Sequence, residues 1–535
     1  MPVHSQHEQL HHGGGGFFSR EAVSGIPWMV LAKLLLFFVY FGVSVLIVNS
    51  LGKEKFGVYS IITNISGYLL VLCGLGLGSA LVRYVPELAN HRNRRGLVHL
   101  LWKSAALQFA ATCAATGLLF SLAAPLQRLF NAGHVEHFRF YLMLACGLVG
   151  LRLLKEFIAT VFTSMFRMRA VALLSVVQGV VWLMVLFVWL AASPEVSTVF
   201  YVQMLSIGLV YTVGAALLAR HVRGLPWKKN LPYGIGKRRT LKFSGTAMLS
   251  AILRMAMFKY SEIFFLAFAA GTTAAGVYDL GYSLPFTIVT FIPLALLSLF
   301  TAAFAEAYVK DRNCLGRLIS SYYKLLIMVS LPVAVPGAFF SPVAYHIIYK
   351  GEMDEAGLVA SAFCIVLLLP LISIPLSTAL KAKEKAHSML PMMVFQIAVN
   401  LFLDWLLIVN LRLGVWGGVV AVAGTFFLTI VPRLMVARRL IGGIYFPGGF
   451  FRRIVSVLVL EAAVFFWITR QVKLFEIFGD DWINTVLLFG VGMLYLLVFL
   501  LLVHVLRLVR QSDIADFQAM GIPRLNKLLA RLFGV

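Results

Sequence analysis

The chain has 535 residues, of which 60% are apolar and only 13% are charged, and its mean hydropathy is +0.90. A water-soluble core could not bury this much apolar surface, so the composition excludes a soluble protein and indicates a membrane protein. The formal net charge of +24 would suggest nucleic acid in a soluble protein, but here its placement along the chain decides its meaning.

Long apolar segments recur along the chain, and many of them have roughly the length of ~20 residues that crosses a bilayer as a helix. This pattern excludes a single anchor and also a β-barrel, whose strands are shorter and alternate in polarity. We therefore predict an all-α polytopic fold with fourteen transmembrane helices. The predicted spans are residues 27–49, 58–85, 101–122, 138–160, 171–192, 199–219, 243–268, 276–304, 318–340, 356–380, 388–409, 415–432, 454–469 and 482–506.

Most of the 46 Lys and Arg residues fall in the two tails and in the connectors that follow even-numbered spans. The positive-inside rule makes that side of the membrane cytoplasmic, with both termini on it. The charge then serves topology and contact with anionic lipids, and no nucleic-acid partner is expected.

A glycine-marked turn occurs twice in the chain. The pattern of Gly52, Gly57, Val58 and Tyr59 recurs with identical spacing at Gly271, Gly276, Val277 and Tyr278. An even number of spans separates the copies, so we predict two six-helix lobes of parallel topology, related by an axis along the membrane normal.

The predicted domains follow from this repeat. They are a cytoplasmic tail over 1–26, an N-lobe over 27–219, a basic cytoplasmic linker over 220–242, a C-lobe over 243–437, two extra helices with their preceding loop over 438–506, and an amphipathic cytoplasmic tail over 507–535. The tail before the first span is polar, so no cleaved signal peptide is expected.

Within the first copy, the glycines of Gly74-Leu75-Gly76-Leu77-Gly78-Ser79 lie near the end of the second predicted span. No strand precedes them, so we interpret them as sites of close helix packing inside a membrane span and not as a dinucleotide loop. No catalytic triad, metal-ligand spacing or phosphate-binding loop is present in the sequence, and we expect no enzymatic activity and no organic cofactor.

Ionisable residues inside spans are costly, about 2.5 to 3.5 kcal/mol at the centre of a span, and usually face a cavity or a partner. Five cations occur at such places: Lys33, Arg152, Lys155, Arg254 and Lys259. Fixed cations suit an anionic cargo, since Arg engages phosphate oxygens bidentately and Lys acts as a point charge. The alternative is neutralisation on the helix surface, because Glu156 follows Arg152 by four residues and Glu262 follows Lys259 by three.

Three further residues are gate candidates. Arg83 ends the second span near the cytoplasmic rim, and Glu87 and Glu306 occupy equivalent positions in the two copies of the repeat. A gate contact between these acids and the basic connectors competes with ordinary solvation at the rim, and Arg83 could snorkel to the headgroups instead.

The sequence resembles the polysaccharide-biosynthesis flippases of the multidrug/oligosaccharidyl-lipid/polysaccharide exporter superfamily over about residues 25–440. The shared features are the L-G-x4-G-V-Y turn, the G-L-G-L-G-S-A-L-V-R-Y-V-P-E segment, G-V-Y-D-L-G-Y-S-L in the second half, and V-N-L with Asp404 followed by L-G-V-W-G-G-V-V-A. The resemblance implies a V-shaped transporter that carries polyprenyl-diphosphate-linked sugars across the bacterial inner membrane by alternating access. It implies a lipid-linked saccharide substrate, contact with membrane lipids, and polysaccharide-assembly proteins as partners.

Asn400 and Asp404 lie four residues apart, so their oxygen-bearing groups share one face of a helix. A hard cation prefers oxygen ligands, and Glu262 and Thr425 could join them if their helices flank that face. We therefore expect a site here that couples transport to Na⁺ or H⁺, and the resemblance supports it, because some lipid-linked-sugar flippases are thought to bind Na⁺ near such a pair. The alternative is an interhelical hydrogen bond.

Two other functions stay open at this stage. A multidrug exporter of the same superfamily would favour a cavity with net acid, which the charges inside the spans do not show. A polytopic glycan polymerase or glycosyltransferase would need a sizeable extracytoplasmic loop, and the predicted outer connectors are short.

Overall fold

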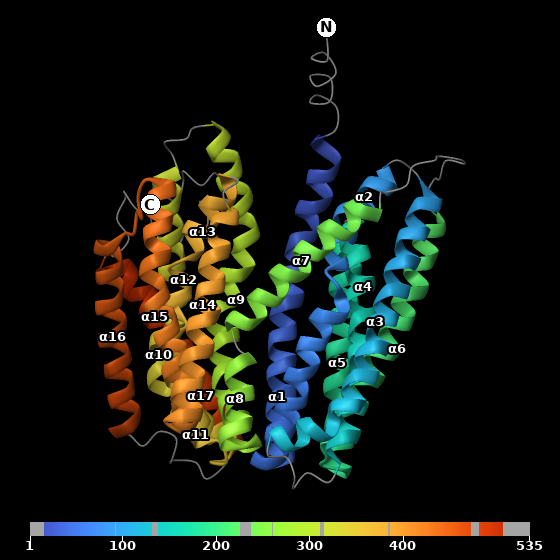
Figure 1. Cartoon of the computed structure of the whole chain (residues 1–535). Coiled ribbons are helices and arrows are strands. Elements are labelled where there is room, and N and C mark those ends of the chain that lie inside the picture. The colour runs from blue at the N-terminus through green and yellow to red at the C-terminus, as the bar shows by residue number, and fades with distance from the viewer. Residues whose placement is uncertain are drawn as a thin grey trace. The chain divides into compact units, whose positions relative to one another are not determined.

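The computed structural model describes residues 15–90, 93–130, 137–165, 167–224, 237–258, 260–310, 315–383, 386–471 and 481–506. Every regular element within these residues is a helix, which confirms the predicted all-α fold class (Figure 1). The chain divides into two compact units, Met1–Met255 and Ala256–Val535. This division falls inside a helix, beyond the basic linker at 220–242, and the domain limits drawn from the sequence stay predictions.

Unit 1 is built from long helices. They are α1 (Gly15–Gly74), α2 (Leu77–Asn90), α3 (Arg94–Leu129), α4 (Phe138–Ser164), α5 (Met168–Ala192), α6 (Val196–Gly224) and α7 (Lys237–Phe258), whose last residues lie past the division. Helix α1 packs against α5 and α4, and α6 packs against α4 and α5. These four helices surround the polar residues of the first candidate site.

Unit 2 has more interruptions in its helices. Its elements are α8 (Tyr260–Ala270), α9 (Thr272–Lys310), α10 (Leu315–Ile348), α11 (Asp354–Val366), α12 (Leu368–Leu371), α13 (Ile374–Ala382), the 3₁₀ helix η2 (Ala386–Met389), α14 (Leu390–Asp404), the π-helix η3 (Trp405–Asn410), α15 (Gly414–Ile441), α16 (Gly448–Gln471) and α17 (Asp481–Val505). Helices α14 and α15 lie side by side, and α16 and α17 both pack on α10.

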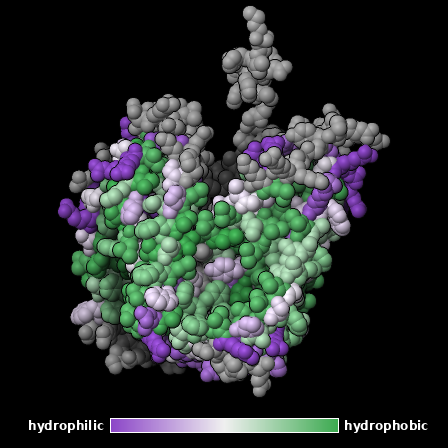
Figure 2. All heavy atoms as spheres, viewed as in Figure 1, coloured by the Kyte–Doolittle hydropathy of each residue, from purple (hydrophilic) through white to green (hydrophobic). Residues whose placement is uncertain are grey.

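Nine helical stretches of the described residues are long and apolar enough to cross a bilayer. They are Leu31–Gly74, Arg94–Leu129, Met168–Ala192, Val196–Gly224, Leu315–Ile348, Asp354–Lys381, Leu390–Asn410, Gly414–Ile441 and Val486–Val505. On the face shown in Figure 2, apolar residues cover the middle of each unit and hydrophilic residues gather toward the helix ends. The chain is thus a multi-pass membrane protein, and the count of fourteen spans stays a prediction.

The repeated turn of the sequence is also a repeat in the backbone. Gly52 has a φ of 71° and kinks α1, and Gly271 has a φ of 90° between α8 and α9. Side chains with a Cβ rarely adopt such angles, so glycine is the residue that allows the chain to reverse at both places. The kink at Gly52 divides the long α1 into the first predicted span and most of the second.

The second predicted span, 58–85, contains a break that the sequence analysis did not predict. Helix α1 ends at Gly74, Leu75 and Gly76 have φ angles of 50° and 65°, and α2 begins at Leu77. The carbonyl freed at Gly74 accepts a hydrogen bond from Gln108 Nε2 of α3 at 3.5 Å. Within a membrane such a break is tolerated where the protein itself satisfies the freed backbone groups.

Close packing does explain Gly76, as the sequence suggested. A Cβ built on Gly76 would lie 2.2 Å from the carbonyl oxygen of Ser244 and 2.7 Å from the amide nitrogen of Met248. Both atoms belong to the backbone of α7, so no side-chain movement could make room. At the break in the second span, the backbone of α7 therefore packs directly against Gly76.

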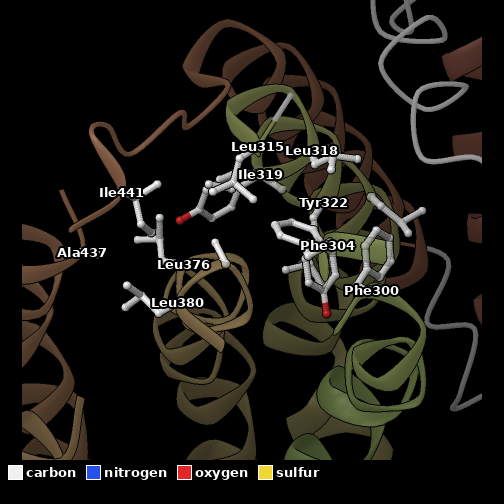
Figure 3. Close-up of a cluster of buried hydrophobic side chains, with 14 residues drawn as sticks. Phe300, Phe304, Leu315, Leu318, Ile319, Tyr322, Leu376, Leu380, Ala437 and Ile441 are labelled. Carbon is white, nitrogen blue, oxygen red and sulfur yellow. The ribbon is translucent and has the colours of Figure 1, made fainter. Parts of the chain in front are cut away.

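A cluster of buried hydrophobic side chains lies between α9, α10, α13 and α15 in unit 2 (Figure 3). It joins Phe300 and Phe304 of α9 to Tyr322 of α10, whose ring stacks on Phe300 with centroids 3.7 Å apart. Helices α13 and α15 complete the cluster through Leu376, Leu380, Ala437 and Ile441. We call this set of residues the apolar cluster.

Candidate functional site

Two cations of α4 lie among polar side chains inside unit 1. Arg152 donates from Nη2 to Gln203 Oε1 of α6 at 3.1 Å. Lys155 donates from Nζ to Gln178 Oε1 of α5 at 2.8 Å, and Gln178 is 1% exposed. Arg152 and Lys155 are one turn apart, so both face the neighbouring helices α5 and α6.

The two glutamines are themselves held in place. Gln178 Nε2 donates to Ser206 Oγ at 3.3 Å, and Ser206 Oγ donates to the carbonyl of Gln203 at 2.9 Å. The ammonium of Lys155 also lies 5.8 Å from the centroid of the Tyr211 ring. A glutamine oxygen satisfies a cation's hydrogen bond without adding a negative charge, so these bonds orient the two cations inside unit 1. Glu156, which follows Arg152 by four residues, is exposed and interacts electrostatically with both Arg152 and Lys155, so the alternative of neutralisation on the helix surface stays open.

The other predicted cations are not brought to this network. Lys33 lies on α1 with an exposed side chain. Arg254 lies on α7, but its side chain is outside the described part of the structure, as is the whole of Lys259. Their cavity roles stay predictions.

The gate candidates of unit 1 lie where α2 meets α7. Glu87 Oε1 lies 4.0 Å from Arg239 Nη1, a residue of the predicted basic linker. The guanidinium of Arg239 stands 5.5 Å from the Tyr84 ring centroid, and that of Arg83 stands 5.5 Å from the Phe243 ring centroid. Arg83 and Glu87 thus contact α7, and their gate role stays a prediction. Glu306 lies on α9, with its side chain outside the described residues.

The residues predicted to bind a coupling ion come together in unit 2. Asn400 Nδ2 donates to Glu262 Oε1 at 2.9 Å and to Thr425 Oγ1 at 3.4 Å. Ser261 Oγ donates to Asn400 Oδ1 at 2.9 Å. Helices α8, α14 and α15 thereby meet at one amide, and all four of these side chains are buried.

Three carboxylate oxygens of this site have no hydrogen-bond donor among the described residues. Both carboxylate oxygens of Asp404 and Oε2 of Glu262 have no hydrogen-bond partner among the described residues, although Asp404 is 0% and Glu262 2% exposed. Asp404 lies close enough to Glu262 to interact with it electrostatically. Ionising two carboxyls that are buried together is costly. A cation bound between them, or a proton bound by one of them, removes most of this cost. The arrangement suits a small hard cation or a shared proton.

The backbone next to Asp404 is unusual. The π-helix η3 follows it directly, and Leu411 N bonds to Leu406 O at 2.9 Å, five residues back. Such wide turns often occur at functional sites. No three His, Cys, Asp or Glu side chains of the described residues converge on a metal, so a cation here would rely on two carboxylates and neutral oxygens.

Arg433 is a further cation inside a helix that was not predicted from the sequence. Arg433 of α15 donates from Nη1 to Ser373 Oγ at 3.2 Å and from Nη2 to Gln396 Oε1. The twelfth span was predicted to end at 432, which placed Arg433 in a cytoplasmic connector, but α15 continues to Ile441. The spacing of four between Thr425, Thr429 and Arg433 was the available signal that Arg433 shares their helix face.

The comparisons with known proteins agree with this architecture. The model of a family described as "Polysaccharide biosynthesis protein" matches residues 22–304, more than half of the chain. No curated protein matches the chain.

Solved structures of similar fold are transporters by their descriptions. The lipid II flippase MurJ, in an inward closed conformation, shares 13% identity over 90% of this chain and 100% of its own, with a TM-score of 0.65. An inward-facing multidrug resistance MATE family transporter of the MOP superfamily shares 17% identity over 76% of this chain and 94% of its own, with a TM-score of 0.63.

A MOP superfamily transporter from Pyrococcus furiosus, whose description speaks of a binding pocket of reverse polarity, shares 16% identity over 79% of this chain and 96% of its own, with a TM-score of 0.57. At these identities the likenesses show the fold alone.

Proposed function

The chain belongs to the polysaccharide biosynthesis protein family, and on this premise we propose that it is a flippase for a polyprenyl-diphosphate-linked oligosaccharide. It would move this lipid across the bacterial inner membrane by alternating access, for assembly of a cell-surface polysaccharide. The neighbour described as a lipid II flippase supports transport of a lipid-linked saccharide on this fold.

The observation that carries the proposal is the network of Arg152 and Lys155 in unit 1. A diphosphate has to be stabilised while it crosses a medium of low dielectric constant, and fixed cations do this if their charge is not cancelled. Both cations are held and oriented by neutral glutamine oxygens, and the one acid that interacts with them, Glu156, is exposed. The saccharide would travel in the aqueous interior and the polyprenyl tail would remain in lipid, in contact with membrane lipids throughout.

We further propose that the site of Glu262, Asn400, Asp404 and Thr425 binds the coupling ion, Na⁺ or H⁺. The unpaired carboxylate oxygens support this role, because an ion entering the site would relieve the cost of burying them. Loading and release of the ion would then shift the balance between two conformations of the transporter.

A multidrug exporter is the second candidate, and one observation favours it. The buried acids Glu262 and Asp404 would suit a cationic drug as well as they suit an inorganic cation. The fold likeness favours transport over the alternative of a glycan polymerase or glycosyltransferase.

Reconstitution in proteoliposomes tests these proposals. With a polyprenyl-diphosphate oligosaccharide on one leaflet, we expect its headgroup to reach the opposite leaflet faster than in protein-free vesicles, and faster with an inward Na⁺ or H⁺ gradient than without one. Transport of cationic drugs with no movement of the saccharide lipid would instead support the exporter. No transport of either under any gradient would overturn both.

A further inference from the structure

Polar side chains form a buried line along the contact of α14 and α15. Gln396, Asn400 and Asp404 follow one another at intervals of four on α14, and Thr425, Thr429 and Arg433 do so on α15. Gln396, Asn400, Asp404, Thr425 and Thr429 are each no more than 3% exposed. Residues four apart on a helix rise about 6 Å, so the line extends about 12 Å away from Asp404.

The two halves of this line face each other in antiparallel order. Asn400 bonds to Thr425 at 3.4 Å, and Gln396 accepts from Arg433 at the other end. Thr429 lies between them, and its hydroxyl donates to the carbonyl of Thr425 at 2.6 Å. Hydroxyl and amide oxygens of this kind can replace the water around a small cation.

The line ends at a fixed positive charge. Arg433 reaches across it from α15 to Gln396 and also bonds to Ser373, which lies in the break between α12 and α13. Ser373 in turn donates to the carbonyl of Pro370 at 2.8 Å, and Tyr323 of α10 donates to the carbonyl of Ile372 at 2.7 Å. The guanidinium therefore ties three parts of unit 2 together at one point.

Beyond Arg433 lies the apolar cluster. Ala437 and Ile441 are one and two turns further along α15, and Leu376 and Leu380 follow Ser373 on α13 (Figure 3). A cation that moved along the line from Asp404 would meet first a like charge and then buried hydrophobic side chains.

Unit 1 contains a similar contact, in which a cation donates to a buried glutamine. The separation of Gln178 from Gln396 along the chain is within one residue of the separation of Gly52 from Gly271, and Gln178 also accepts from a cation, Lys155. The cation comes from α4 in one unit and from α15 in the other.

We propose that the line from Asp404 to Gln396 is the route by which the coupling cation enters or leaves its site, and that Arg433 is the gate on that route. The proposal rests on the coupling site proposed above. Arg433 would have to release Gln396 and Ser373, and the apolar cluster would have to part, before a cation could pass. Opening at this end is then coupled to movement of α13 against α15.

The test follows exchange of radioactive Na⁺ on the purified full chain, with its association rate, dissociation rate and equilibrium affinity measured separately. In Arg433→Gln we expect both rates to rise at least tenfold and the dissociation constant to change less than the rates, because removing a gate lowers the barrier to both entry and exit more than it changes the bound state. Arg433→Lys keeps the charge and should retain most of the slow exchange. Ser373→Ala removes one contact of the gate, keeps the charge, and should accelerate exchange by a smaller factor.

Arg439→Gln is the matched control, since it removes the same charge from an exposed position six residues further along α15. It should exchange Na⁺ at the parent rate. Parent-like rates in both Arg433→Gln and Ser373→Ala would overturn the gate and leave the ion site standing. A rise in only one of the two rates, so that the dissociation constant changes as much as that rate, would also overturn it. A parent protein that binds no Na⁺ would overturn the Na⁺ site itself, and the route with it.

Discussion

Asn400 donates to Glu262 at 2.9 Å, across 138 residues of sequence, and this contact fixes α8 to α14 beside a carboxyl group that has no hydrogen-bond partner among the described residues, that of Asp404. The amide uses its oxygen for Ser261 and its nitrogen for Glu262 and Thr425, so it has nothing left to offer Asp404. Ser261 also lies near Asp404, but its single hydroxyl proton is directed to Asn400. A substitution of Asp404 is therefore the most direct test of the ion site.

We predict that Asp404→Asn removes stabilisation by Na⁺. A ligand that binds only the folded state at 100 times its dissociation constant stabilises it by about 2.7 kcal/mol. The parent should therefore show a higher unfolding temperature in detergent with Na⁺ than with a bulky organic cation, and the variant should show no difference. Without Na⁺ the variant should be at least as stable as the parent, because it no longer buries an unpaired carboxylate.

Asp354→Asn is the control for this experiment, since Asp354 is exposed and pairs with His346 at 3.0 Å. It should respond to Na⁺ like the parent. An Asp404→Asn variant that keeps the full response to Na⁺ would contradict the assignment.

Lys155→Met should slow transport of the saccharide lipid. The variant keeps the unbranched side chain up to the ε position but loses the ammonium, and with it the charge and the bond to Gln178. Hydrogen bonds to charged groups contribute about 1.5 to 3 kcal/mol, so we expect a loss of roughly 10- to 100-fold in the transport rate.

Arg139→Gln removes a charge from the same helix α4 at an exposed position and should leave the rate nearly unchanged. If Lys155→Met stops efflux of a cationic drug while saccharide transport continues, the cation network does not serve the saccharide lipid.

Gly76→Ala should destabilise unit 1. The new methyl group would meet the backbone of Ser244 and Met248, and the residue would also keep a φ of 65°. Overpacking costs about 1 to 3 kcal/mol and a left-handed angle about 1 to 2 kcal/mol, so a clear fall in the unfolding temperature is expected. Gly78→Ala is the matched control two residues away, where the nearest atom is Thr160 Oγ1 at 4.0 Å and the substitution should be tolerated.

Glu87→Gln should change stability by less than about 1 kcal/mol, because its partner Arg239 is about half exposed and the pair is separated by 4.0 Å. The variant therefore distinguishes a role of Glu87 in gating from a purely structural role. A change in transport rate at unchanged unfolding temperature supports the gate, and an unchanged rate would assign Glu87 to ordinary solvation at the rim.

The sequence predicted the helical class, the repeated turn at Gly52 and Gly271, and the shared helix face of Asn400 and Asp404. These follow from local rules: apolar length, glycine at reversals, and a spacing of four. It also named Glu262 and Thr425 as residues that could join that face, and the structure brings both to Asn400.

Other features depend on contacts that a single sequence does not display. The break at Leu75 was missed because the apolar run continues through it, and the backbone that packs against Gly76, that of α7, lies five helices further along the chain. Gln178 and Gln396 are neutral, so the search for ionisable residues inside the spans did not single them out. Arg433 was placed outside the membrane because arginine after an apolar run ordinarily marks a connector.

The most direct measurement compares two lipids in the same proteoliposomes, a polyprenyl-diphosphate oligosaccharide and the same oligosaccharide on an uncharged polyprenyl linkage. Appearance of each headgroup on the opposite leaflet is followed over time. The account predicts that only the diphosphate lipid is moved faster than in protein-free vesicles, and that Lys155→Met largely abolishes the difference. Equal movement of both lipids, or movement of neither, would contradict it.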